Sequence, residues 1–203
     1  MTTRLILVRH GVTEWNREYR FQGQTDIQLS REGREQALAL QKRLLREKLD
    51  FIYSSDLCRA WETAEIIAEP HQKQVRFVPG MRELNFGIWE GLTYGEIERG
   101  YPELVKIWRE NPHLLTLPQG ESFEILRDRS VVAIETLLKT HPGDTIAVVT
   151  HGGTIAASIC GLLGEPLSQM WNYKQQNTAV NILTKSSQGI KLDTFNDISH
   201  LKS

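Results

Sequence analysis

Two histidine residues far apart in this chain of 203 residues stand in almost the same local sequence. His10 follows the run Leu-Ile-Leu-Val-Arg, His151 follows the run Ile-Ala-Val-Val-Thr, and a glycine comes after each histidine. Imidazole serves as a nucleophile or a proton carrier, and the planar fork of N–H donors on arginine fits a phosphate group. Two such histidines, with Arg9 beside the first, therefore predict chemistry on an anion, and phosphate is the simplest candidate.

The loop after His10 carries further polar groups that a phosphate could use. Thr13 and Asn16 add a hydroxyl and an amide, and Gly11 lets a substrate approach the backbone. Positive charge near the His10 ring disfavours its protonation, so the ring is expected to be neutral, and hence nucleophilic, at pH 7. Taken alone, Arg9 and His10 fit equally well the end of a strand, with the histidine bonded to the backbone.

Two later segments offer further groups that bind anions. Arg59 comes three residues after Asp56, which is expected to cap a helix, and the positive end of a helix favours anions. By itself, Arg59 would also fit a solvent-facing position. His151 opens another predicted helix, where the N–H groups of Gly152 and Gly153 are expected to face an oxyanion. All these groups follow strands of a predicted parallel sheet, so they are expected to meet at its carboxyl edge.

A proton donor for the leaving group is also present. Glu83 comes just after a predicted strand, and a bound phosphate dianion would favour the protonated carboxyl, which could then supply a proton to a leaving alkoxide. As a single residue, Glu83 is equally well explained as a surface carboxylate. The carboxylates of Glu90, Glu96 and Glu98 lie further along the chain and are expected to be solvated.

The remaining histidine and cysteine residues do not suggest a metal site. No spacing typical of zinc ligands and no phosphate-binding loop of the Gly-Lys-Ser/Thr type is present, so neither a metal nor a nucleotide cofactor is expected. Cys58 and Cys160 each fall in an apolar helical pattern and are expected to be reduced core residues. The scattered histidines are His71, His113, His141 and His200.

The composition limits the kinds of partner. Lys and Arg number 24 and Asp and Glu number 25, so the net charge is −1, and binding to nucleic acid or to an acidic membrane surface is not expected. No apolar run is long enough to span a bilayer, and the first predicted strand begins too early to leave room for a signal peptide. A cytoplasmic location is therefore expected.

Strand-like and helix-like apolar patterns alternate along the chain, as in an α/β protein. Unbroken apolar runs indicate strands covered on both faces, and hence a mostly parallel sheet between two layers of helices. The expected strands lie at 5–9, 51–53, 75–78 and 146–150, with a hairpin at 179–184 and 190–195. The expected helices begin after Ser30 and Asp56 and cover 122–139 and 153–163. The apolar residues of the helix after Ser30 are Ala37, Leu40, Leu44 and Leu45.

The segment at about 84–120 has no regular period and is rich in aromatic residues. Glycines and prolines interrupt it, which is typical of a short cap inserted into a larger domain. Trp89 and Trp108 could stack on a substrate or pack the cap against the body, and both interpretations stay open.

Six segments of the chain carry a resemblance to a known family. The run Leu-Val-Arg-His-Gly-Val-Thr-Glu-Trp-Asn at 7–16 resembles the signature of the histidine phosphatase superfamily, also called phosphoglycerate mutase-like. Matches continue at 23–30, 53–60, 82–91, 120–122 and 150–153. The resemblance implies a single domain over 1–203, a three-layer α/β/α sandwich with a mostly parallel central sheet and a short helical cap. Val12 departs from the pattern, since many members carry glutamate or glutamine there.

The same resemblance implies a role for each candidate residue. His10 would be the phosphorylated nucleophile, and Glu83 the proton donor and later the base for water. The residues implied to hold the phosphoryl group are Arg9, Arg59 and His151. The residues implied to line the phosphate and substrate pocket further include Asn16, Gln22, Gly23 and Gly152.

The short cap is most similar to the branch of small bacterial phosphatases. That branch implies a metal-independent phosphomonoesterase, a phosphoric monoester hydrolase of the histidine acid phosphatase type, with no cofactor. Candidate substrates are phosphoserine, α-ribazole 5′-phosphate and the phosphoglycerates, and the protein would be a monomer or a homodimer. Two alternatives stay open: a cofactor-dependent phosphoglycerate mutase, which would be longer with a more basic cap, and an inactive protein that binds a phosphorylated ligand.

Overall fold

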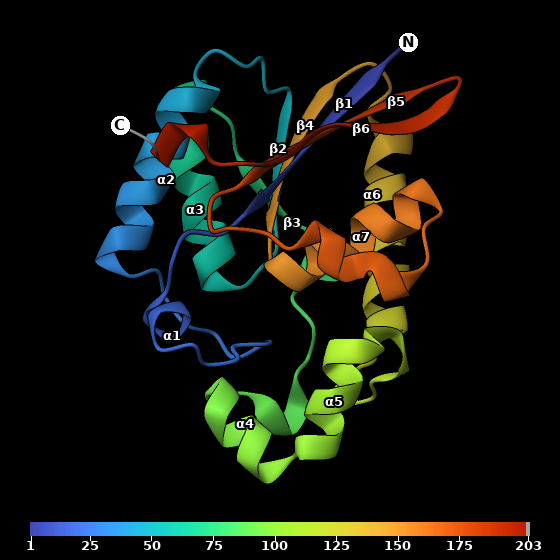
Figure 1. The fold of residues 1–203 in the computed structure, drawn as a ribbon. Coiled ribbons are helices and arrows are strands. Elements are labelled where there is room, and N and C mark those ends of the chain that lie inside the picture. Colours follow the sequence, from blue (N-terminus) through green and yellow to red (C-terminus); the bar gives the residue numbers. More distant parts are fainter. Residues whose placement is uncertain (202–203) are drawn as a thin grey trace.

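A mostly parallel sheet of six strands forms the centre of the computed structural model, which describes residues 1–201. In chain order the strands are β1 (Thr3–Arg9), β2 (Phe51–Ser54), β3 (Val75–Phe77), β4 (Thr145–Thr150), β5 (Val180–Ser186) and β6 (Gly189–Asp197). Across the sheet the order is β3-β2-β4-β1-β5-β6; β5 is antiparallel to both of its neighbours, and the other five strands run in one direction. The predicted fold class and the predicted terminal hairpin are confirmed (Figure 1).

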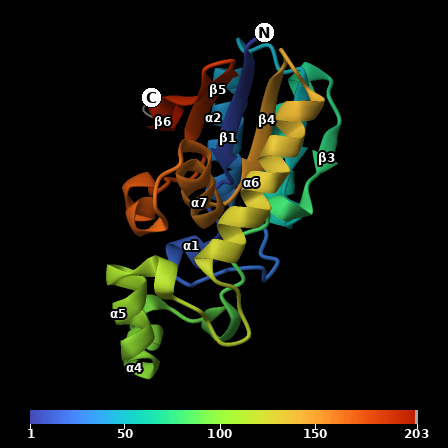
Figure 2. The same ribbon diagram turned by 90° about the vertical axis from the view of Figure 1, so that its right-hand side faces the viewer.

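Helices cover both faces of this sheet, which gives the three predicted layers (Figure 2). The α-helices are α1 (Glu14–Arg17), α2 (Arg31–Leu44), α3 (Cys58–Ala68), α4 (Tyr94–Gly100), α5 (Pro102–Glu110), α6 (Phe123–Thr140) and α7 (Gly152–Leu163). The first face packs against α2 and α3, and the second packs against α6 and α7. In residues 1–201, no helix is long and apolar enough to cross a membrane.

Strand β1 shows why the four consecutive residues at positions 5–8 are all apolar. Ile6 and Val8 pack with the core on the α2 and α3 side, whereas Leu5 and Leu7 pack with the core on the opposite side. Successive side chains of a strand point to opposite faces, so a strand covered on both sides needs an unbroken apolar run.

Helices α4 and α5 lie beyond the carboxyl ends of the parallel strands, apart from the two helical layers (Figures 1 and 2). Trp89, at the end of the short 3₁₀ helix Gly87–Trp89, is fully buried in a separate apolar cluster. This cluster includes Val105 of α5, Phe123 of α6 and Ala156 of α7. The Trp89 side chain therefore packs the segment that precedes α4 and α5 against α6 and α7.

The start of α3 differs from the prediction. Asp56 does not cap this helix, because Leu57 occupies the N-cap position and the helix begins one residue later, at Cys58. The N–H of Cys58 instead donates to Oδ1 of Asp26, 2.8 Å away, and Asp56 pairs with Arg82. The acceptor at this helix end thus comes from a different loop, which the local sequence could not indicate.

Of the apolar residues named for the helix after Ser30, Leu45 is 53% exposed and lies just past the end of α2, as its C-cap residue. Cys58 is only partly buried, since it is the first residue of α3, whereas Cys160 is buried as predicted and both thiols are free. Ser30 caps α2 as predicted, accepting the N–H of Gly33 at 3.0 Å.

We expect Leu40→Ala to lower the free energy of unfolding by about 2–5 kcal/mol, because the Leu40 side chain is fully buried against β1 and the change leaves a cavity. The matched control is Leu38→Ala on the same helix, where the side chain is 46% exposed and a change of about 0.5 kcal/mol or less is expected. Urea denaturation measures both, and equal losses would contradict the packing described here.

Candidate active site

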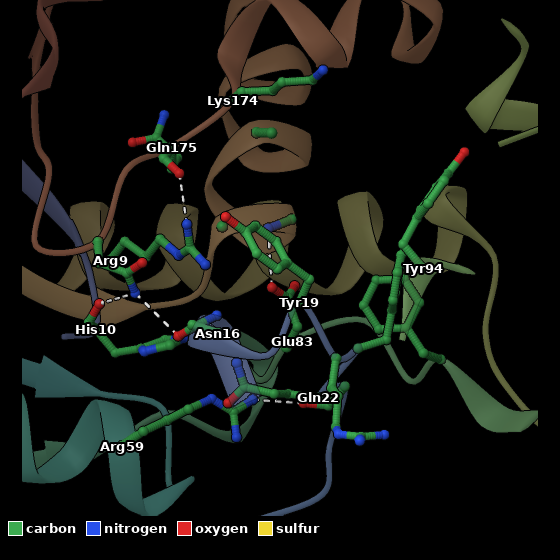
Figure 3. A pocket seen from close by; sticks show the side chains of 18 of the residues that line it. Arg9, His10, Asn16, Tyr19, Gln22, Arg59, Glu83, Tyr94, Lys174 and Gln175 are labelled. Atoms are coloured by element: carbon green, nitrogen blue, oxygen red, sulfur yellow. Dashed lines mark hydrogen bonds between the residues drawn. The ribbon is translucent and has the colours of Figure 1, made fainter. Parts of the chain in front are cut away.

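A cavity of about 570 Å³ opens at the carboxyl end of β1 and reaches the residues of α4 and α5. Eight of the nine residues predicted for the site line it: Arg9, His10, Asn16, Gln22, Gly23, Arg59, Glu83 and Gly152. Figure 3 shows that these side chains come from separate elements and gather at one end of the cavity. The ninth, His151, lies just behind, with its ring centroid 5.2 Å from that of His10.

The two histidines meet because β1 and β4 are parallel neighbours with Arg9 opposite Thr150. The backbone N–H of His10 continues the ladder by donating to the carbonyl oxygen of Thr150 at 3.0 Å. Nδ1 of the His10 ring lies 2.7 Å from the carbonyl oxygen of Gly11. A carbonyl can only accept, so Nδ1 donates and Nε2 keeps its lone pair. The geometry therefore sets the His10 tautomer that a nucleophile needs.

The protonation of His10 is suppressed by its surroundings. Burial lowers the pKa of His10 well below 6.5, and the positive charges of Arg59 and Arg9 lower it further. We predicted the effect of the cations from the sequence, but the loss of water around the buried ring is the larger cause. The pKa of His151 is lowered well below 6.5 in the same way, first by burial and then by Arg59. Both rings are therefore neutral at pH 7.

The second histidine is held by a residue that sequence reasoning missed. Nε2 of His151 lies 2.9 Å from Oγ of Ser55, the first residue after β2. Nδ1 of His151 is buried and has no hydrogen-bond partner in the part of the chain that the structure describes. The position of Ser55 at the carboxyl end of a predicted strand was a signal that could have found it.

The two arginines are fixed by backbone carbonyl groups. Nη1 of Arg9 donates to the carbonyl oxygen of Gln175 at 2.7 Å. Nη1 and Nη2 of Arg59 donate to the carbonyl oxygens of Thr25 at 2.9 Å and Gly23 at 2.6 Å. Over residues 1–201 neither arginine forms an ion pair, and the Nε atom of each is buried without a partner. Burial lowers the pKa of both guanidinium groups, and the negative charge of Glu83 offsets part of that effect.

Three buried nitrogen atoms at the site thus lack partners among residues 1–201: Nε of Arg9, Nε of Arg59 and Nδ1 of His151. Leaving a buried polar group unpaired costs about 1–3 kcal/mol. A phosphoryl group offers several oxygen acceptors and negative charge to two buried cations. This end of the cavity is therefore suited to bind a phosphate.

Glu83 lies at the amino end of α7 and accepts hydrogen bonds from it. Its Oε2 accepts the N–H of Gly153 and its Oε1 accepts the N–H of Thr154, both at 3.0 Å. A Cβ atom on Gly153 would lie 2.7 Å from Oε1, so only glycine allows this approach. The prediction that the N–H of Gly153 faces an oxyanion is wrong, because the Glu83 carboxylate already occupies it.

Other residues of the site were also missed or misjudged. Glu90, predicted to be solvated, accepts four hydrogen bonds from two neighbouring segments. Asn177 donates from Nδ2 to the carbonyl oxygen of His10 at 3.0 Å and lines the cavity beside Gln175. The segment that carries Gln175 and Asn177 has no apolar period and no motif, so nothing in the sequence indicated their place.

Six aromatic rings dominate the rest of the cavity wall, and we call this part the aromatic chamber. Its rings are Phe21, Phe86, Tyr94, Trp108, Phe123 and Trp171, and the charged side chains of Arg20 and Lys174 also line the cavity. The rings form a connected set of contacts, with ring centroids 5.0 Å apart for the edge-to-face pair of Phe21 and Phe86 and 5.2 Å apart for that of Trp108 and Trp171, whereas Tyr94 meets Trp108 at a tilted angle. The two tryptophans of the cap differ. Trp89 is buried in the apolar cluster and packs the cap against the body, as one interpretation of the sequence held, whereas Trp108 lines the cavity.

Metal ligation finds no support in the described residues, since no three of their His, Cys, Asp and Glu side chains lie close enough together to hold an ion. The cavity instead has two parts. One end is buried and cationic and contains the neutral ring of His10, and the other is the aromatic chamber. Fold and site together fit an α/β enzyme that acts on a phosphorylated substrate. The chain belongs to the histidine phosphatase superfamily (branch 1), whose family model matches residues 5–198, and this confirms the resemblance seen in the sequence.

Individual relatives agree with this assignment. Phosphoserine phosphatase 1 of Hydrogenobacter thermophilus is 36% identical over 98% of this chain and 94% of its own length. A metal-independent phosphoserine phosphatase of Arabidopsis thaliana is 37% identical over 99% of this chain and 84% of its own length. The solved structure of Bacillus stearothermophilus YhfR is 34% identical, covers 98% of this chain and 99% of its own, and superimposes with a TM-score of 0.93.

We expect the free energy of unfolding to fall as the pH is lowered from 7 to 5. His10 and His151 titrate near 6.5 in the unfolded chain but well below it in the folded chain, so the unfolded state binds more protons in this range. The stability is present above the unfolded pKa and is lost as the pH falls towards the folded pKa. Burial also lowers the pKa of His200 to about 4, which adds in the same direction.

Urea denaturation at pH 7 and pH 5 measures this effect, because carboxylates remain largely ionised over that interval. His10→Gln and His200→Gln should each reduce the difference between the free energies of unfolding measured at pH 7 and at pH 5. A protein that is equally stable at both, or more stable at pH 5, would contradict the assignment of neutral buried rings.

Proposed function

We propose that this enzyme hydrolyses phosphate monoesters of small metabolites in two steps, through a phosphohistidine on His10 and without a metal ion. The observation that carries the proposal is the His10 ring, which is neutral, keeps the lone pair on Nε2 and lies beside two buried arginines with unpaired donors. A neutral imidazole attacks phosphorus, and fixed cations stabilise the charge on the transferred group.

In the first step, Nε2 of His10 forms a bond to phosphorus while the bond from phosphorus to the leaving oxygen breaks. Glu83 gives its proton to that oxygen, so the product leaves as an alcohol. The proton on Nδ1 of His10 stays on that nitrogen, hydrogen-bonded to the carbonyl oxygen of Gly11. Arg9, Arg59 and His151 hold the oxygens of the phosphoryl group throughout.

In the second step, the Glu83 carboxylate takes a proton from water as the water oxygen bonds to phosphorus. The bond between phosphorus and Nε2 breaks, and its electron pair returns to His10. Inorganic phosphate leaves, Glu83 is protonated again, and the enzyme has returned to its starting state. The N–H groups of Gly153 and Thr154 stabilise the carboxylate form that acts in this step.

The aromatic chamber supports a preference within the broad class of small phosphate esters. Glu83 is the only carboxylate among the described residues that line the cavity, so the ammonium of an amino-acid ester would find no second acidic partner. Aromatic rings bind flat or apolar groups by burial and stacking. Phosphoserine, which the names of two relatives suggest, would find Arg20 and Lys174 for its carboxylate but no acidic partner for its ammonium, so we expect the chamber to favour an aromatic or apolar ester.

The test is phosphate release with EDTA present, over a panel of p-nitrophenyl phosphate, naphthyl phosphate, phosphoserine, α-ribazole 5′-phosphate and both phosphoglycerates. We expect release without metal, with kcat/KM higher for the aromatic esters than for phosphoserine. His10→Ala should lose roughly 10³-fold or more, because the nucleophile is removed. Interconversion of the phosphoglycerates without release would instead indicate a mutase, and full activity of His10→Ala would exclude the mechanism.

Glu83→Gln separates the acid role from binding. The first turnover should slow by roughly 10²-fold or more for an alkyl phosphate, whose leaving oxygen needs a proton, and far less for p-nitrophenyl phosphate. Rapid-quench measurement of the released alcohol or phenol reports this step alone. Equal losses for the two esters would remove Glu83 from the acid role.

A further inference from the structure

Glu90 links the cap to the loop beside Arg59. It follows the 3₁₀ helix Gly87–Trp89, and its neighbour Trp89 is fully buried, so the backbone at this point is anchored. From there the carboxylate reaches across to residues 24 and 25, more than sixty positions earlier in the chain. No motif of the sequence joins these two segments.

Each oxygen of the Glu90 carboxylate accepts two hydrogen bonds. Oε1 accepts the N–H of Gln24 at 2.9 Å and the N–H of Phe86 at 3.2 Å. Oε2 accepts the N–H of Thr25 at 3.0 Å and its hydroxyl at 2.5 Å. Hydrogen bonds to a charged acceptor are roughly twice as strong as neutral ones, so this set holds the loop firmly.

The loop tethered in this way is the one that holds Arg59. The carbonyl oxygens of Gly23 and Thr25 accept both Nη groups of Arg59, and Gly23 has a φ of +53° that favours glycine. A Cβ atom on Gly23 would come within 2.0 Å of Oε1 of Glu90, so the loop lies directly over the carboxylate. The bonds to Arg59 and the bonds to Glu90 therefore meet within residues 23–25 and share Thr25.

Both hydrogen bonds that orient the Arg59 guanidinium go to backbone carbonyl oxygens. The side chain is fully buried, and it forms no ion pair within residues 1–201. The backbone bond inside the loop joins the N–H of Thr25 to the carbonyl oxygen of Gln22 at 3.0 Å. The orientation of Arg59 thus depends on two carbonyl groups. Glu90 accepts the N–H of the peptide that carries the Gly23 carbonyl, and it also holds the N–H and hydroxyl of Thr25, the residue that supplies the other carbonyl.

We propose that Glu90 is a positioning residue for phosphoryl transfer: by fixing the backbone of residues 23–25, it aims Arg59 at the phosphoryl group. The inference rests on the proposed function, in which Arg59 holds that group. Glu90 itself does not touch the substrate. Its effect should therefore be the same for every ester, since Arg59 contacts the transferred group and not the leaving group.

The test is Glu90→Gln, which leaves one oxygen acceptor and turns an NH₂ group towards two donors. We expect kcat/KM to fall by roughly 10- to 100-fold for p-nitrophenyl phosphate and for an alkyl phosphate alike, as a misplaced contact group costs about that much. The inhibition constant of orthovanadate, which imitates the five-coordinate transition state, should rise by the same factor. Thr25→Val, which removes one of the four bonds and leaves the backbone intact, should give a smaller loss of the same kind.

The matched control is Glu96→Gln. Glu96 lies in the same cap and also accepts the N–H and hydroxyl of a threonine, Thr93, but it has no contact with the loop of Arg59. Its loss should lower thermal stability slightly and leave kcat/KM and vanadate inhibition near the wild-type values. A similar fall in activity for Glu96→Gln would show that any weakened cap has this effect, and would overturn the proposal.

A double-mutant cycle with Arg59→Met distinguishes positioning from general support. If Glu90 acts through Arg59, Glu90→Gln should have little further effect once Arg59 is replaced. Independent losses that multiply would overturn the role of Glu90 while leaving the proposed function intact. Full activity of Arg59→Met would instead count against the phosphate grip in the proposed function.

Discussion

The parallel pairing of β1 with β4 is the constraint on which the site depends. Its register places Arg9 opposite Thr150, and each strand continues directly into a histidine. Because the two strands are neighbours, residues separated by 141 positions in the sequence have their rings 5.2 Å apart. A slip of one residue would turn one of the two histidines to the opposite face of the sheet. The apolar residues that fix the register therefore also fix the catalytic geometry.

Burial of charge is the second theme of this structure. Arg9 and Arg59 are withdrawn from water without an ion pair among residues 1–201, and backbone carbonyl oxygens together with the nearby charge of Glu83 offset part of that cost. The same burial that strains the arginines keeps His10 and His151 neutral. A substrate that brings negative charge relieves the cations at the moment when the neutral ring is needed. Affinity and nucleophile activation thus have one physical origin.

Much of this architecture could be predicted from the sequence because its signals are local. The apolar runs before His10 and His151 indicated buried parallel strands, and Ser30 indicated the start of α2. What failed depends on contacts between distant segments. Asp26 rather than Asp56 supplies the acceptor at the start of α3, and Glu83 rather than an open N–H group lies at the start of α7. Such pairings are settled by how loops meet, which no periodic pattern encodes.

The aromatic chamber shares no side chain with the groups that hold the phosphoryl group. Phe86 illustrates the separation: its backbone N–H bonds to Glu90, whereas its ring stands in the cavity wall. A different side chain at this position would leave the backbone bond in place and change only the shape offered to the leaving group. The enzyme is in this sense modular, because side chains of the chamber can change without replacing any group of the proposed reaction centre. Selection, natural or in the laboratory, could therefore redirect such a scaffold to new esters without rebuilding its chemistry.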